Sequence, residues 1–234
     1  MIDLLGALVP LTVIIPLFAA GLTLVVGRRP RAPRIIAVIA LAVVLAIGVA
    51  LLLGVDDAGT VVVEVGSWPA PFGIVLVVDR LSALMVVVSA IVLLAVLVFS
   101  IGQGLADGDD ETPVSIYYPT YLILTAGVMI AFIAGDLFNL YVGFEVLLVA
   151  SYVLITLGGT ESRIRAGVTY VVVSLVSSLL FLASIAMVYG ALGTVNLAQI
   201  AIRIQDIPVD TQIVLHVMLL VAFGIKAAVF PLSF

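Results

Sequence analysis

Two ionisable side chains lie inside apolar segments that are long enough to cross a membrane. Lys226, the only lysine of the chain, lies within the apolar run 213–234, and Glu145 lies within another, 137–157. A charged side chain at mid-bilayer depth costs about 2.5 to 3.5 kcal/mol on insertion scales, and is usually retained where it faces a bundle interior or a water-filled path. A basic and an acidic group at lipid depth therefore indicate ion or proton movement.

Lys226 and Glu145 have complementary proton chemistry. Desolvation makes a lysine release its proton more readily, whereas a nearby carboxylate favours the charged ammonium, so movement or protonation of Glu145 could switch Lys226 between two states. Each residue lies well inside its run, and we expect the pair to face each other near mid-membrane. A static ion pair is the alternative, but buried ion pairs stabilise proteins less efficiently than hydrophobic packing. Electrostatically gated proton translocation is the better interpretation.

Three further polar residues of these two segments are accessory candidates. Tyr141 and Tyr152, at i−4 and i+7 from Glu145, share its helix face, where they could hydrogen-bond the carboxyl group or form a packed seam. His216, near the start of the last apolar run, is either a proton relay or a satisfied interfacial histidine, and the second reading is favoured.

Two aspartates begin apolar segments. Asp136 follows Gly135 at a position typical of a helix N-cap, and capping is favoured over a role in ion entry. Asp79 lies beside Arg80 at the start of another segment, where a solvated helix end is favoured over an interfacial or structural role. Serines form a polar stripe on a further segment, and such stripes usually indicate close helix packing rather than a water path: Ser174, Ser177, Ser178 and Ser184.

Composition defines the class of protein. Hydrophobic residues make up 65% of the 234 positions and charged residues 10%, which leaves too little polar surface for a soluble globular protein. The chain has no cysteine and a single histidine, so thiol chemistry is excluded and haem or multi-histidine metal sites are disfavoured; we expect no cofactor and no metal. A net charge of −5 argues against nucleic-acid binding.

The apolar stretches have the length of membrane-spanning helices, not of barrel strands. The fold class we predict is therefore an all-α polytopic membrane protein with about seven transmembrane helices. The candidate spans are about 4–26, 35–53, 81–101, 117–134, 137–157, 166–190 and 213 onward.

The arginines predict the orientation in the membrane. The loops 27–34 and 158–165 together hold six arginines, whereas the loops on the other side hold only Arg80 and Arg203. Because cytoplasmic loops are enriched in Lys and Arg, we expect the first two loops in the cytoplasm and the N-terminus outside. The first run precedes its basic cluster, so it is not a cleavable signal peptide. We expect a multi-pass protein of the plasma membrane.

Two connections and one proline suggest additional structure. A β-branched stretch bounded by Gly59 and Gly66 favours an outer hairpin within about 54–78, and the pattern over 196–205 favours a helix lying in the outer interface. Pro231 has no N–H to donate and its ring clashes with the preceding turn, so we expect a discontinuous seventh helix, broken just after Lys226. An ordinary proline kink is the alternative.

Four segments resemble a known family of membrane proteins. They are GDLFNLYVGFEVLLVASY (135–152), AFGIKAAVFPL (222–232), VDRLSAL (78–84) and YGALGTVNL (189–197). Together they make the chain similar to the D-type subunits of the Mrp multisubunit Na⁺/H⁺ antiporters, which are related to the proton-pumping subunits of complex I and of membrane-bound hydrogenases. The Phe-Glu and Gly-Ile-Lys-Ala segments are specific for the superfamily, and Asp-Leu-Phe-Asn-Leu favours the D-type subunit.

The resemblance has implications for the site and the domain organisation. It implies that Glu145 is the glutamate of the fifth helix and Lys226 the lysine of a discontinuous seventh helix, paired at one half-channel. The family fold has about fourteen helices with two inverted five-helix repeats. On that basis residues 1–101 are the first three helices, residues 117–234 begin the first inverted repeat, and the sequence is interpreted as an N-terminal fragment.

Three classes of function follow. The favoured one is a subunit of a secondary transporter, not an enzyme, that works with other antiporter subunits and moves H⁺ and, by resemblance, Na⁺. The second is a proton-pumping subunit of a redox-driven assembly of the complex I or hydrogenase type. The third is a membrane scaffold that contacts partner subunits without transporting ions. No nucleophile and base arrangement and no phosphate-binding loop points to covalent catalysis.

Overall fold

A computed structural model of the chain describes residues 2–26, 31–103, 116–157 and 159–229. Within these ranges the elements are α1 (Ile2–Val25), α2 (Ala32–Ala58), β1 (Val61–Glu64), a 3₁₀ turn η1 (Val65–Ser67), β2 (Val75–Val78), α3 (Arg80–Gly102), α4 (Tyr117–Ile133), α5 (Leu137–Thr156), α6 (Glu161–Leu192), α7 (Leu197–Arg203), a 3₁₀ turn η2 (Ile204–Asp206) and α8 (Val209–Lys226). The described part is helical apart from its small sheet, as the composition predicts.

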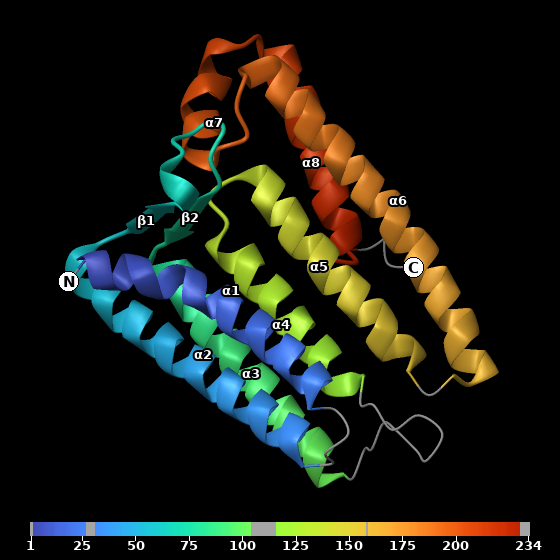
Figure 1. Ribbon diagram of the computed structural model, residues 1–234. Helices are drawn as coiled ribbons and strands as arrows, with labels where there is room; N and C mark the ends of the chain where they lie inside the picture. The colour runs from blue at the N-terminus through green and yellow to red at the C-terminus, as the bar shows by residue number, and fades with distance from the viewer. Residues whose placement is uncertain (1, 27–30, 104–115, 158, 230–234) are drawn as a thin grey trace.

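The long helices run in alternating directions, so their connections gather at two ends of the molecule (Figure 1). The hairpin end comprises the β1–β2 hairpin, the turn 134–136 and the segment 193–208, and it includes Arg80 and Arg203. The opposite end comprises the starts of α2 and α6, with four described arginines: Arg31, Arg34, Arg163 and Arg165.

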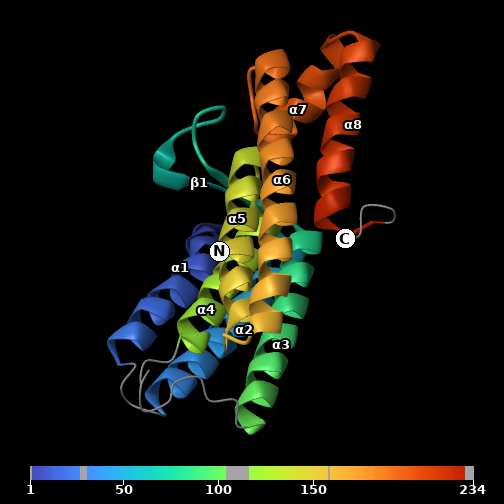
Figure 2. The same cartoon turned by 90° about the vertical axis from the view of Figure 1, so that its right-hand side faces the viewer.

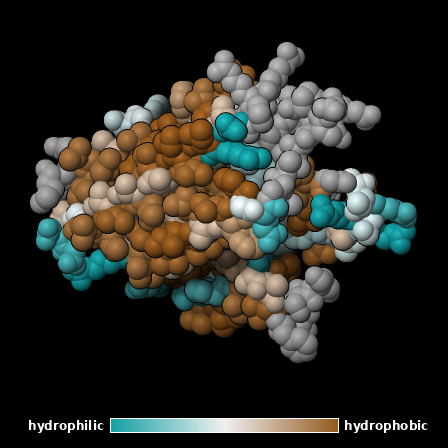
Figure 3. Space-filling model, turned by 90° about the horizontal axis from the view of Figure 1, so that it is seen from below, coloured by the Kyte–Doolittle hydropathy of each residue, from teal (hydrophilic) through white to brown (hydrophobic). Residues whose placement is uncertain are grey.

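Six helices of the described part are long and apolar enough to cross a membrane: α1, α2, α3, α5, α6 and α8. α4 is also apolar but has only 17 residues, so the expected count of seven spans stays a prediction. The surface is rich in exposed apolar side chains such as Phe18, Phe99 and Leu179, and Figure 3 shows the hydrophobic colour covering most of the visible face. A lipid surround explains this surface, because water-exposed apolar patches of this extent are rare in soluble monomers.

The helices form two packed groups. α1, α2, α3 and α4 pack together with the hairpin around a core that includes Leu51, Val86 and Met129. α5, α6 and α8 pack around a second core that includes Phe181, Ile185 and Leu215 (Figure 2). α4 packs extensively against α5 and thereby joins the two groups.

Glycines allow the close approach of α4 and α5. A Cβ atom added to Gly127 would lie 2.6 Å from the backbone nitrogen of Leu147, and one added to Gly143 would lie 2.8 Å from Cγ2 of Ile130. Small residues at such crossings let two membrane helices pack backbone to backbone. This contact fixes the position of α5, which carries Glu145.

The hairpin region differs in detail from the sequence-based expectation. α2 continues to Ala58, beyond the predicted end near residue 53, because a helix can extend past the last lipid-facing turn into polar residues such as Asp56. The strands β1 and β2 then pair antiparallel, with Val61 opposite Val78 and Glu64 opposite Val75. The described part is therefore not purely α-helical, because β-branched residues at both strands favour pairing.

The segment after α6 forms a short helix at the hairpin end. The Asn196 side chain accepts a hydrogen bond from the Gln199 N–H at 3.2 Å and so caps α7. Arg203, in the last turn, donates to the carbonyl of Leu192 at the end of α6, at 2.9 Å. α7 is thereby folded back onto the end of α6, and its placement in an outer interface stays a prediction.

Candidate functional site

The beginning of α5 is anchored by a buried aspartate. Asp136 is only 4% exposed, and its carboxylate accepts hydrogen bonds from the Asn139 N–H at 2.6 Å and from the Val75 N–H of β2 at 3.4 Å. The same turn is tied to the α6–α7 connection, because the Leu137 N–H donates to the Val195 carbonyl at 2.9 Å. Burial raises the pKa of the Asp136 carboxyl, and the backbone hydrogen bonds partly oppose this effect. The geometry is that of an N-cap.

The end of α8 is defined by its backbone hydrogen bonds. The Val229 N–H donates to the Gly224 carbonyl and the Ala228 N–H to the Ile225 carbonyl, which is the Schellman pattern of helix termination. Ala228 has φ of 51°, a left-handed conformation that usually requires glycine. Lys226 is therefore the last residue of α8, where the partial negative charge of the helix terminus favours a cation.

Pro231, the expected helix break, lies outside the described residues. The end of α8 at Lys226 is compatible with an interruption directly after the lysine. Whether the helix resumes beyond this point, as a discontinuous helix would, stays a prediction.

The structure brings Glu145 and Lys226 together. The Lys226 Nζ lies 3.8 Å from Glu145 Oε1, and the exposed fractions of the two side chains are 6% for the lysine and 27% for the glutamate. At this separation and an effective dielectric constant near 20, two unit charges attract each other by about 4 kcal/mol. The protonation state of one group therefore acts strongly on the other.

A serine hydroxyl from α6 joins the two charged groups. Ser178 Oγ donates a short hydrogen bond to Glu145 Oε1 and accepts one from Lys226 Nζ at 3.2 Å. The site is thus built from three helices, with the carboxylate on α5, the hydroxyl on α6 and the ammonium at the end of α8.

Aromatic rings enclose the ammonium on the side of the hairpin end. Lys226 Nζ lies 5.3 Å from the ring centroid of Phe144 and 5.9 Å from that of Phe181, within the range of cation–π attraction. The Phe181 ring in turn packs on Phe223, with 4.9 Å between centroids. These three phenylalanines, which we call the aromatic cluster, replace water around one side of the ammonium.

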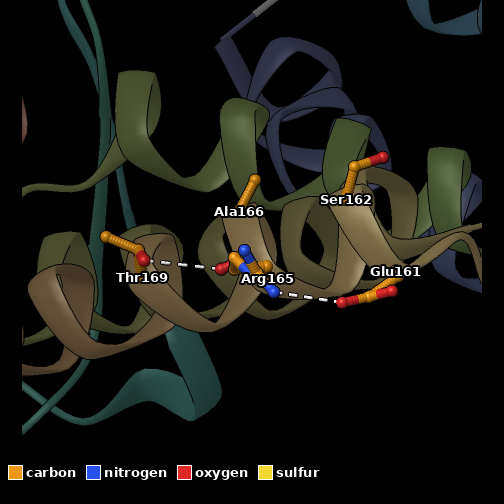
Figure 4. A pocket seen from close by; sticks show the side chains of 5 residues that line it. All are labelled: Glu161, Ser162, Arg165, Ala166 and Thr169. Carbon is orange, nitrogen blue, oxygen red and sulfur yellow. Dashed lines mark hydrogen bonds and ion pairs between the residues drawn. The ribbon is translucent and has the colours of Figure 1, made fainter.

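A cavity of about 540 Å³ also reaches Lys226, and Phe144 of the aromatic cluster forms part of its wall. It lies between α5 and α6, and its lining includes polar side chains of α6, namely Thr169, Tyr170, Ser174 and Ser177. A second, more open cavity of about 630 Å³ lies at the start of α6, and shares Ala166 and Thr169 with the first. Figure 4 shows this outer cavity, where Arg165 forms a 3.0 Å ion pair with Glu161. Ala166 and Thr169 thus line both the outer cavity at the start of α6 and the inner cavity that reaches Lys226.

The accessory tyrosines lie near the pair but make other contacts. Tyr141 packs edge-on against Phe181, with ring centroids 5.9 Å apart. Tyr152 packs edge-on against Tyr170 of α6 at 5.4 Å. Neither tyrosine has a described hydrogen bond to Glu145, so the packed-seam alternative fits the described contacts better.

His216 and Asp79 lie away from the pair. His216 is exposed on α8, and its Nδ1 lies 2.7 Å from the carbonyl of Gln212 in the same helix. Asp79 forms a capping box with Ser82 at the start of α3: its carboxylate accepts from the Ser82 N–H at 2.8 Å, and its N–H donates to the Ser82 hydroxyl at 2.8 Å. Both groups have structural partners and lie outside the three-helix site.

Sequence reasoning missed the position of Ser178. The sequence predicts the serine stripe of α6 to be a packing feature, and Ser184 fits this prediction, since its hydroxyl donates to the Leu180 carbonyl at 2.8 Å. The only signal in the sequence was the spacing of the stripe along one helix, but that spacing cannot tell which hydroxyl meets a charged neighbour.

Comparison with known proteins identifies the family of membrane proteins to which the chain is related. The transmembrane family described as NADH:quinone oxidoreductase/Mrp antiporter matches residues 134–234, the part that holds both Glu145 and Lys226. The fold is also that of a solved Mrp complex from a Dietzia species, with a TM-score of 0.88 and 33% identity over 98% of this chain and 42% of that one.

Individual relatives narrow the class to the D-type subunits. The chain is 38% identical to the D-type subunit of the Na⁺/H⁺ antiporter of Alkalihalophilus pseudofirmus over 97% of its own length. It is also 36% identical, over its whole length, to the D-type subunit of a probable K⁺/H⁺ antiporter of Rhizobium meliloti. The resemblance inferred from sequence motifs is confirmed, and the chain is a homologue of the D-type subunits of Mrp antiporters. It spans 44 to 45% of the length of these two relatives.

Proposed function

We propose that the chain is the part of a D-type subunit that moves protons within a multisubunit monovalent cation/H⁺ antiporter. The observation that carries the proposal is the contact between Glu145 and Lys226, 3.8 Å apart on α5 and α8, with Lys226 lining a cavity. In this mechanism protonation or displacement of Glu145 weakens the electrostatic attraction between its carboxylate and the Lys226 ammonium, and Lys226 then releases its proton.

The cavities along α6 support access from one side. Ala166 and Thr169 line both the outer cavity at the start of α6 and the inner one at Lys226, so the two cavities are neighbours along α6. Hydroxyl groups line the inner cavity, and such groups can hold water molecules that conduct protons. Protons reach Lys226 from this end in our proposal, while the aromatic cluster closes the other side.

The same geometry supports the proposed orientation in the plasma membrane. Four arginines of the described residues lie at the end of the molecule from which the cavity opens, and the positive-inside rule assigns that end to the cytoplasm. The N-terminus and the hairpin are then outside. Because the chain has no cysteine, single cysteines test this orientation: an impermeant thiol reagent added to intact cells should label Trp68→Cys and leave Arg163→Cys unlabelled. Labelling of Arg163→Cys alone would reverse the orientation.

Ion exchange in the assembled complex tests the function. The full-length subunit carrying Glu145→Gln or Lys226→Ala should give complexes with less than about a tenth of the wild-type rate of exchange, measured in vesicles with a pH-sensitive dye after addition of NaCl or KCl. Asp57→Asn, the same carboxylate-to-amide change at an exposed position, is the matched control and should exchange normally. Wild-type exchange by both site variants would refute the proposal.

Two alternatives have distinct signatures in the same experiment. A scaffold without transport predicts that Lys226→Ala reduces assembly of the complex and leaves the exchange per assembled complex unchanged. A redox-driven pump, which the breadth of the matching family keeps open, predicts that the subunit copurifies with iron–sulfur subunits and that transport requires an electron donor. The 36 to 38% identity to D-type antiporter subunits favours the antiporter.

A further inference from the structure

Ser178 is unlike the neighbouring serines of α6 in the contacts it makes. Ser184 donates to its own helix, and Ser177 has a buried hydroxyl with no hydrogen-bond partner among the described residues. Ser178, only 3% exposed, instead contacts both charged groups of the site, Glu145 and Lys226. Its hydroxyl is therefore placed by the packing of three helices and not by local helix geometry.

The distances make this hydroxyl the connection between the two charges. At 3.8 Å, Lys226 Nζ and Glu145 Oε1 are farther apart than in a direct hydrogen bond. An ammonium can only donate hydrogen bonds and a carboxylate can only accept them, whereas a hydroxyl does both at once. Ser178 thus completes a continuous chain from nitrogen to oxygen that the ion pair alone does not form.

A hydroxyl in this position suits both protonation states of the pair. With both groups charged, Nζ–H donates to Ser178 Oγ and the Ser178 O–H donates to the Glu145 carboxylate. With both groups neutral, the carboxylic acid can donate to Oγ, and the hydroxyl can donate to the free amine. Both hydrogen bonds reverse direction, and the same three groups stay connected.

We propose that Ser178 is a proton relay between Lys226 and Glu145, an inference that rests on the proposed function and adds a residue to it. In the relay step the Nζ–H bond of Lys226 breaks as a new bond forms to Ser178 Oγ, and the original Oγ–H bond breaks as its proton joins Glu145 Oε1. The step starts from the ionised carboxylate: one proton leaves the ammonium, one reaches the carboxylate, and the serine is unchanged. Protonation of Glu145 and loss of the proton from Lys226 are then the same event. No oxidant, cofactor or further reactant is needed.

The side chains of Lys226, Ser178 and Glu145 form the polar centre of the site. Among the described residues, the further titratable side chains close to the pair are the phenols Tyr141 and Tyr152 on α5 and Tyr170 on α6. His216 on α8 is exposed and bonded within its own helix. Glu145 and Lys226 are accordingly the charged groups that the Ser178 hydroxyl faces.

The test compares serine variants in the full-length subunit within its assembled complex. Ser178→Ala removes one oxygen atom. We expect this variant to slow exchange about tenfold and to shift the pH of half-maximal exchange by about one unit. The free energy of one hydrogen bond to a charged group corresponds to roughly such a tenfold change. Ser178→Thr keeps the hydroxyl and should recover at least about a third of the wild-type rate. Ser184→Ala, which removes a buried hydroxyl bonded to its own helix, is the matched control and should leave rate and pH profile unchanged.

The outcomes separate the relay from the proposed function. Wild-type rate and pH profile in Ser178→Ala, with Glu145→Gln inactive in the same assay, would overturn the relay alone. Equal slowing in Ser178→Ala and Ser178→Thr at normal assembly would also overturn it, because packing and not the hydroxyl would then matter. If Ser178→Ala reduces assembly, exchange is expressed per assembled complex, and a rate per complex equal to wild type would still overturn the relay. Wild-type exchange by Glu145→Gln and Lys226→Ala would instead refute the proposed function.

Discussion

Gly127 of α4 lies directly against Gly143 of α5: a Cβ atom added to Gly127 would come within 2.9 Å of the Gly143 carbonyl oxygen and 2.6 Å of the Leu147 nitrogen. Both obstacles are backbone atoms, which cannot rotate away as a side chain can. The crossing that fixes α5, and with it Glu145, therefore depends on the absence of a side chain at residue 127.

Gly127→Ala should destabilise the subunit for this reason. Forcing a methyl group into a tight backbone contact costs typically about 1 to 3 kcal/mol. Gly190→Ala is the matched control, because a Cβ atom at this exposed helical glycine would meet nothing within 4 Å, and alanine is the better helix former by up to about 1 kcal/mol. Thermal unfolding of the purified complex in detergent should show a lower midpoint for Gly127→Ala only. Equal midpoints for the two variants would contradict the packing argument.

Lys226→Arg should abolish ion exchange without loss of assembly. Arginine keeps the positive charge beside Glu145, but its guanidinium does not release a proton at accessible pH. The comparison with Lys226→Ala separates the two roles of the lysine, since a fixed charge is preserved only in the arginine variant. Exchange at the wild-type rate in Lys226→Arg would show that the residue is a static charge and not a proton carrier.

Ala228→Gly should stabilise the end of α8. Ala228 has φ of 51°, and replacing a non-glycine residue in this left-handed position by glycine relieves about 1 kcal/mol. The neighbouring Ala227 has φ of −85°, where glycine offers no such relief, so Ala227→Gly serves as the control and should be neutral or destabilising. The midpoint of thermal unfolding measures both effects, and a lower midpoint for Ala228→Gly would argue against this helix terminus.

The capping box of α3 predicts a pH-dependent contribution to stability. Hydrogen bonds from the backbone and then the side chain of Ser82 lower the pKa of Asp79 below its ordinary value of 3.8. A depressed folded-state pKa means that the stabilisation is present above pH 3.8 and is lost as the pH falls through the lower value. Asp79→Ala should cost about 1 kcal/mol near neutral pH. The difference from wild type should shrink on acidification below the ordinary pKa. A constant difference across this range would exclude the carboxylate as the cap.

The sequence predicted the features that follow from the lipid environment. Long apolar runs must form helices in lipid, and the described helices α1 to α6 and α8 occupy these runs with shifted ends. The cost of placing Lys226 and Glu145 at lipid depth pointed to a shared interior position, and the structure places their charged atoms 3.8 Å apart.

Other features depend on packing that a single sequence does not encode locally. The extension of α2 to Ala58 includes Asp56 and Asp57. These two charged residues interrupt the apolar pattern from which a membrane-spanning helix is predicted. Ser178 and Ser184 are chemically identical residues on one helix, yet one bonds to Glu145 and the other to its own backbone. Only the arrangement of α5 and α8 around α6 distinguishes them.

The aromatic cluster has an electrical consequence for proton movement. Phe144, Phe181 and Phe223 lie on the hairpin side of Lys226 and belong to an apolar core that continues through Ile185 and Leu215. A wetted cavity conducts, whereas a dry apolar layer insulates, so a transmembrane voltage falls mainly across this layer. In this conformation Lys226 lies at the boundary between the cavity and the apolar layer. In the proposed function, a proton that arrives along α6 works against little of the voltage, and most of the electrical work falls on the step that crosses the phenylalanines.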